Sequence, residues 1–126
     1  MNRQTYSRPI LSIDTKRNCI RIHKCTLHLL GDPEYIQLLV NPDAKLIAVM
    51  RSTRADNLAH KVKYNRSIDH NCFELYSTPL LQTLQRVTKD WATNAGYRMY
   101  GEFNKKNNIA HFSMNDIVLI NETAKE

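Results

Sequence analysis

The stretch CIRIHKCTLHLLGDPEYIQLLVNPDAKLIAVM, residues 19–50, decides the fold because its pattern changes repeatedly over a short length. CIRIH is typical of a strand, and KCTLHLL is typical of a short helix over 24–30 that Gly31 ends. Pro33 prevents this helix from continuing. EYIQLLV and KLIAVM then predict a hairpin, because NPDA between them has the chemistry of a tight turn.

Further strands are predicted on both sides of this stretch. ILSID precedes CIRIH and predicts a first hairpin. HKVKY predicts an edge strand, because alternating lysines protect an open sheet edge against pairing. CFELYS and DIVLI predict two more strands, and YRMYGEFNKKNNIAHFSM predicts a hairpin that turns at NKKNN.

The strongest helix signal covers residues 78–94. Thr78 is suited to capping the helix, Pro79 to its first position and Gly96 to its stop. The helix has one apolar stripe that must pack on a sheet, formed by Leu80, Leu84, Val87 and Trp91. We therefore expect an α+β fold of antiparallel β-hairpins, with one main amphipathic helix at 78–94 and a short helix at 24–30.

The length of 126 residues predicts a single domain. A shift of 63 residues lays VNPDAKLIAV (40–49) on FNKKNNIAHF (103–112), and a helix ended by glycine precedes each segment. This indicates a strand-helix-hairpin pseudo-repeat with halves 10–52 and 72–120, joined by a basic polar segment 53–71. Such halves would form either one continuous sheet with both helices on one side or two small lobes.

Charge is distributed unevenly along the chain. The formal net charge is +6; residues 1–66 contain twelve Lys or Arg against five Asp or Glu, and residues 67–126 contain six against seven. A basic half attracts polyanions, of which nucleic acid is the commonest in cytoplasm. No apolar run reaches the ~20 residues that a membrane span requires, and the N-terminus has no apolar signal segment, so a cytoplasmic location is expected.

Signatures of catalysis or of a cofactor are weak. His23, Cys25 and His28 could ligate zinc with Cys19 nearby, but H-x-C-x2-H is not a standard structural spacing. The three cysteines are too few for a disulfide framework and are expected to be thiols. Only three glycines are present, so a glycine-rich phosphate loop is excluded. We expect no enzyme activity and no cofactor.

Residues 20–49 resemble the half-barrel of AbrB-like swapped-hairpin transcription regulators. The matching features are Ile20 and Ile22, Leu27, Leu30-Gly31-Asp32, the strand 35–40 and the strand 46–49. The resemblance implies a DNA-binding module that interlocks as a homodimer. His23 stands where the family has proline, and the long helix has no counterpart in this pattern. In general style the chain also resembles small proteins of bacterial phages and mobile elements.

These observations favour a non-enzymatic nucleic-acid-binding protein, a small transcription regulator acting on DNA. A protein-interaction or assembly module that recruits a partner strand is the alternative. In the first case phosphates would be neutralised by basic residues of the first half, namely Arg17, Arg21, Lys24, Arg51, Arg54, Lys61, Lys63 and Arg66.

Overall fold

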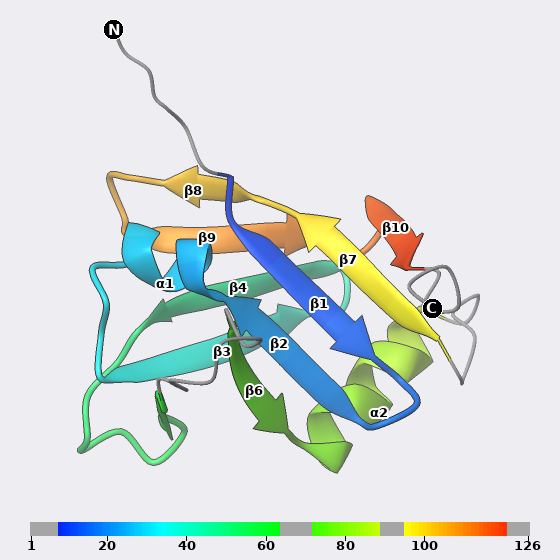
Figure 1. The fold of residues 1–126 in the computed structure, drawn as a ribbon, viewed down its shortest axis with the longest axis horizontal. Helices are drawn as coiled ribbons and strands as arrows, with labels where there is room; N and C mark the ends of the chain where they lie inside the picture. The colour runs from blue at the N-terminus through cyan, green and yellow to red at the C-terminus, as the bar shows by residue number, and fades with distance from the viewer. Residues whose placement is uncertain (1–7, 64–71, 89–94, 121–126) are drawn as a thin grey trace, which may run out of the picture.

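The computed structural model describes residues 8–63, 72–88 and 95–120, which form two antiparallel sheets of five strands and two helices (Figure 1). The α+β expectation is confirmed. The first sheet has the order β10-β7-β1-β2-β6, and the second has the order β5-β3-β4-β9-β8. The strands of the first sheet are β1 (Ile10–Asp14), β2 (Cys19–His23), β6 (Cys72–Tyr76), β7 (Gly96–Tyr100) and β10 (Ile117–Ile120). Those of the second are β3 (Tyr35–Asn41), β4 (Leu46–Arg51), β5 (His60–Lys61), β8 (Glu102–Asn104) and β9 (Ile109–Ser113).

One core lies between the two sheets. Because side chains alternate along a strand, each sheet buries one row of apolar residues and turns a second row outward. In the first sheet Leu11 and Ile20 are fully buried, and in the second Ile47 and Phe112 are fully buried and directly paired. Helices α1 (Lys24–Leu29) and α2 (Thr78–Val87) contribute to this core through Leu27, Leu81 and Leu84.

Three hairpins turn in the same way. In each, an Asp or Asn oxygen accepts the backbone N–H three residues later at 3.1–3.2 Å, and the fifth residue has a positive φ of 54–57°. This side-chain bond closes the turn much as a backbone bond would. The acceptor and positive-φ residues are Asp14 and Asn18 in β1–β2, Asn41 and Lys45 in β3–β4, and Asn104 and Asn108 in β8–β9.

The 63-residue shift therefore relates the β3–β4 turn to the β8–β9 turn residue by residue. The chain around the helices differs, because α1 leads directly into β3, whereas α2 leads into β7 of the other sheet. Each sheet combines strands from 10–52 and from 72–120. The expectation of one continuous sheet or two lobes is thus wrong, because the two parts of the chain interleave.

Helix α2 begins and ends differently from the prediction. Ser77, not Thr78, is the N-cap, and its hydroxyl accepts the N–H of Leu80 at 3.4 Å. The helix ends at Val87 instead of at 94, because Thr88 leaves the helical conformation and its hydroxyl bonds the Leu84 carbonyl. Trp91, the predicted end of the apolar stripe, lies outside the described residues.

The chain changes sheet at Gly101, between β7 and β8. A Cβ at this position would lie 2.3 Å from the backbone oxygen of His111 and 2.6 Å from the Phe112 ring. The Gly101 N–H also bonds the Pro9 carbonyl at 2.9 Å. Only glycine permits so close an approach of β7–β8 to β9.

Candidate nucleic-acid interface

The second sheet places three of the predicted basic residues around one hollow at its β5 edge. Tyr35 begins β3 and lies directly opposite Lys61 of β5, and the next residue, Ile36, lies opposite Arg51 of β4. Two further backbone bonds of 2.8 Å, Ser52 N–H to Tyr35 and Val62 N–H to Glu34, hold the flanking chains against β3. The prediction that HKVKY forms an edge strand is confirmed for His60–Lys61.

The loop that carries Arg54 is held together by Asp56. Its carboxylate accepts the Ser52 hydroxyl at 2.8 Å and the Leu58 N–H at 2.9 Å. The Leu58 N–H first, and then the Ser52 hydroxyl, lower the pKa of Asp56. Asp56 is therefore ionised and engaged within its own loop, and no ion pair joins it to the nearby Arg54.

Arg51 has a structural contact as well as a charge. Its Nη1 donates to the Leu30 carbonyl at 3.3 Å, at the end of α1. Gly31 follows with a φ of +88°, and a Cβ there would lie 2.9 Å from Arg51 Nη1. The glycine that ends the helix thus also makes room for the arginine.

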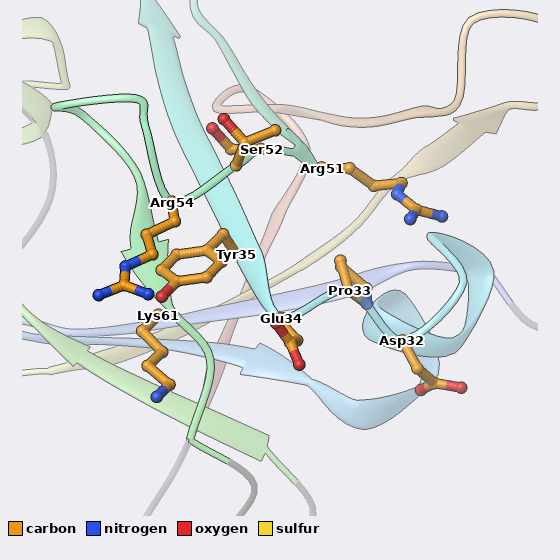
Figure 2. Close-up of a pocket in the computed structure, with 9 residues that line it drawn as sticks. Asp32, Pro33, Glu34, Tyr35, Arg51, Ser52, Arg54 and Lys61 are labelled. Atoms are coloured by element: carbon orange, nitrogen blue, oxygen red, sulfur yellow. The ribbon is translucent and has the colours of Figure 1, made fainter.

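Together these elements line a hollow of about 600 Å³ (Figure 2). Figure 2 shows Arg54 and Lys61 on the same side as the Tyr35 ring, while Arg51 extends toward α1. Within the described residues, no ion pair engages any of the three cations. The lining residues are Asp32, Pro33, Glu34, Tyr35, Arg51, Ser52, Thr53, Arg54 and Lys61.

Two acids also border this hollow. Asp32 is engaged by His28, whose Nδ1 lies 2.6 Å from its Oδ1. Glu34 is exposed, and Figure 2 shows its carboxylate pointing away from Arg51. The cations therefore outnumber the acids, and one of the two acids already has a partner.

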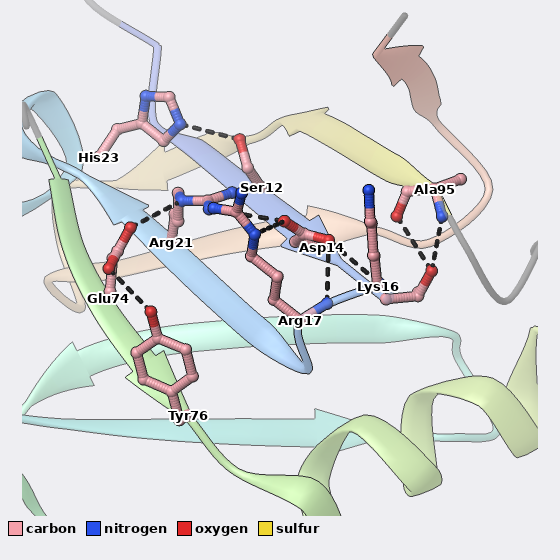
Figure 3. Close-up of polar contacts among 10 residues, drawn as sticks. Ser12, Asp14, Lys16, Arg17, Arg21, His23, Glu74, Tyr76 and Ala95 are labelled. Atoms are coloured by element: carbon pink, nitrogen blue, oxygen red, sulfur yellow. Dashed lines mark hydrogen bonds and ion pairs between the residues drawn. The ribbon is translucent and has the colours of Figure 1, made fainter. Parts of the chain in front are cut away.

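The remaining predicted residues lie elsewhere or are neutralised. Arg21 on β2 donates to Glu74 at 3.0 Å and to Asp14 at 3.5 Å, so its charge is compensated (Figure 3). Arg17 in the β1–β2 turn lies 4.0 Å from Asp14. Lys24 is exposed at the start of α1, and Lys63 is exposed two residues after Lys61; Arg66 lies outside the described residues.

The sequence analysis missed Tyr35, Ser52 and Thr53 as lining residues. Tyr35 was interpretable only as a strand residue, because its position beside Lys61 depends on the pairing of β3 with β5. Serine and threonine after a basic residue are too common to indicate a site. The available signal was the cluster of Arg51, Arg54 and Lys61, which the structure does bring together.

The histidine and cysteine residues considered as zinc ligands include two that form ordinary hydrogen bonds. Cys25 donates to the Arg8 carbonyl at 3.5 Å, and His23 bonds Ser12 at 2.8 Å. In the described ranges, no three His, Cys, Asp or Glu side chains gather in a way that could hold a metal ion. No helix there has the length and apolar character needed to cross a bilayer.

Comparison with known proteins gives no family assignment. No family model matches the chain, and no curated protein or solved structure is significantly similar to it.

Proposed function

We propose that this protein is a non-enzymatic nucleic-acid-binding protein that contacts DNA through the β3–β5 edge of its second sheet. The observation that carries the proposal is the convergence of Arg51, Arg54 and Lys61 on one hollow without an ion-pair partner among the described residues. Unpaired cations on one surface bind phosphates and release counterions, which supplies most of the affinity of non-specific binding.

The three cations have distinct parts in this interface. Arg54 and Lys61 are exposed beside Tyr35 and are free to contact successive phosphates. Arg51 is anchored by the Leu30 carbonyl, so it presents its guanidinium in a fixed orientation. Tyr35 is half-buried and supplies an aromatic side chain on which an unpaired base could stack.

Two other groups extend or limit the surface. Lys63 follows Lys61 at the spacing that returns a side chain to the same face of an extended chain. Arg21 is excluded from the interface because Glu74 and Asp14 compensate it. The AbrB-like resemblance of residues 20–49 agrees with DNA as the ligand, and it stays a prediction.

The test is fluorescence anisotropy with labelled duplex DNA over a range of salt concentrations. Arg54→Gln with Lys61→Gln should lower the slope of log affinity against log salt by about 2 and weaken binding uniformly across sequences. The matched control is Lys16→Gln with Lys45→Gln. It removes one exposed lysine from the β1–β2 turn and one from the β3–β4 turn, neither of which lines the hollow. Equal losses in the two variants would refute this interface, because net charge alone would then explain binding.

A second candidate function is assembly through β10, the edge strand opposite β6 in the first sheet. Its sequence is IVLI, with Val118 and Leu119 53% and 61% exposed. An uncharged apolar edge favours pairing with another strand. Antiparallel pairing of two copies about the middle of β10 would place Val118 of one copy opposite Leu119 of the other. Sedimentation velocity of the protein and of Leu119→Lys tests this: a dimer that the substitution dissociates supports it, and a monomer at high concentration contradicts it.

A further inference from the structure

The outer face of the first sheet carries an unusual row of polar residues. Arg98 of β7, Ser12 of β1, Arg21 of β2 and Glu74 of β6 lie directly opposite one another across four strands. Directly opposite residues of antiparallel strands point to the same face, so these side chains are neighbours. His23 joins them from β2, because its Nε2 lies 2.8 Å from the Ser12 hydroxyl (Figure 3).

The two arginines of this row differ in whether an acidic side chain contacts them. Arg21 is held by Glu74 and Asp14, and its charge is compensated. The side chain of Arg98 forms no hydrogen bond or ion pair with the described part of the chain, and its Nε is buried without a partner. A shielded donor of a charged group that has no acceptor is costly, because water cannot replace the missing partner. Among the described residues, Arg98 is therefore a cation without an anionic partner.

The charged groups that act on His23 are positive. Arg98 faces it from β7, Arg21 lies on its own strand, and Cys72 of β6 is its direct cross-strand neighbour. Burial first, and then Arg98 and Arg21, lower the pKa of His23 to about 4. Burial and Glu74 raise the pKa of the Cys72 thiol, so it adds no charge at neutral pH. The field at this point of the sheet is positive although His23 itself is neutral.

We propose that Arg98 is the anchor of a phosphate-binding site on the outer face of the first sheet, next to Ser12 and His23. A guanidinium presents parallel N–H donors that match two phosphate oxygens, and the terminal Nη groups of Arg98 are not among the buried atoms. Arg98 is partly exposed as a residue, so a ligand can reach its Nη groups although Nε is shielded. The Ser12 hydroxyl orients His23 beside the bound group.

This site is independent of the proposed DNA interface. It lies on β1, β2 and β7 of the first sheet, whereas Arg54 and Lys61 lie at the β5 edge of the second. The ligand class is a phosphate group, either free or carried by a small molecule such as a nucleoside monophosphate. Arg98 would bind it by charge and by two hydrogen bonds, with no covalent step.

The pKa of His23 reports whether phosphate is bound beside Arg98. A phosphate beside Arg98 offsets the positive field that lowers the pKa of His23, so binding must raise that pKa. The experiment is a pH titration of the His23 ring protons by NMR, with and without inorganic phosphate, in the full chain. We expect phosphate to raise the pKa of His23 by about one unit or more. An unchanged pKa at saturating phosphate would overturn the proposal.

Two variants assign the effect to Arg98. Arg98→Gln should raise the pKa of His23 without phosphate and abolish the response to it, and Arg98→Lys should keep a weaker response. The control Arg86→Gln, an exposed arginine of α2, should respond like the unaltered protein. Arg54→Gln with Lys61→Gln should also respond normally, so failure of the DNA interface and failure of this site are distinguishable. A normal response in Arg98→Gln would contradict the assignment.

The source of the phosphate group follows from the same titration. A response at lower concentration to adenosine monophosphate than to inorganic phosphate identifies a nucleotide as the ligand. Equal responses identify free phosphate. Both outcomes support a phosphate site at Arg98.

Discussion

Asp14 combines two tasks that can be separated by substitution. Its carboxylate closes the β1–β2 turn by accepting the N–H groups of Lys16 at 3.0 Å and Arg17 at 3.2 Å. It also lies 3.5 Å from the Arg21 guanidinium, with only 3% of its side chain exposed. Asp14→Asn keeps an oxygen for the turn but removes the charge, and Asp14→Ala removes both.

The expected magnitudes follow from these contacts. Hydrogen bonds to a charged group contribute about 1.5–3 kcal/mol and neutral ones about 1 kcal/mol. Asp14→Asn weakens the turn bonds and leaves Arg21 with Glu74 alone, so we expect a loss of about 1–2 kcal/mol. Asp14→Ala leaves two amides without their acceptor in a partly buried setting and also removes the buried carboxylate beside Arg21, so we expect a loss of about 3–4 kcal/mol.

Urea unfolding measures both losses as shifts of the midpoint at constant slope. Asp43→Asn is the matched control, because Asp43 is exposed in the β3–β4 turn, and its cost should stay below about 0.5 kcal/mol. Since Asp14 is buried, its cost should persist at high salt. Equal costs for Asp14→Asn and Asp43→Asn, or for Asp14→Asn and Asp14→Ala, would refute the reasoning.

Three further changes have definite expectations. Because the pKa of His23 is about 4 in the fold and 6.5 without it, unfolded chains bind more protons than folded chains between these values. The two pKa values correspond to about 2.6 kcal/mol between pH 6.5 and pH 4, and solvent screening at this partly exposed side chain lowers the expected loss of stability to about 2 kcal/mol. Urea titrations in phosphate-free buffer measure this loss, and His23→Gln should flatten the dependence of stability on pH. Gly101→Ala should cost more than about 3 kcal/mol by circular dichroism melting, since its Cβ would meet the His111 carbonyl, and a stable variant would contradict the sheet crossing. Leu84→Ala, at a fully buried position of α2, should cost about 2–5 kcal/mol in the same assay, whereas exposed Gln82→Ala should change little.

Local signals predicted the elements of the fold well. The strands 10–14 and 19–23 and the hairpins at Asn41 and Asn104 follow from short-range rules of alternation and turn chemistry. The division into two sheets did not follow, because it depends on contacts far apart in sequence. The crossing at Gly101 is an example: the glycine is visible in the sequence, but the His111 carbonyl that requires it is not.

Charge predicted part of the candidate interface. The cluster at Arg51, Arg54 and Lys61 depends on one hairpin and one loop, so neighbouring sequence positions stay neighbours in space. Arg21 was assigned to the same surface because sequence shows its charge and hides its partner. Glu74, which compensates it, lies 53 residues further along the chain. Arg98 was left out of the predicted phosphate contacts for the converse reason, because the lack of a partner is visible only in three dimensions.

The loop that carries Arg54 is attached to the sheet at both of its ends. Ser52 bonds Tyr35 on one side of β3, and Val62 bonds Glu34 on the other, while Asp56 ties the loop to itself. Different loops could therefore be grafted between these anchors without repacking the interior. A library of replacements for residues 53–59 on this scaffold would be a direct way to select new ligand preferences.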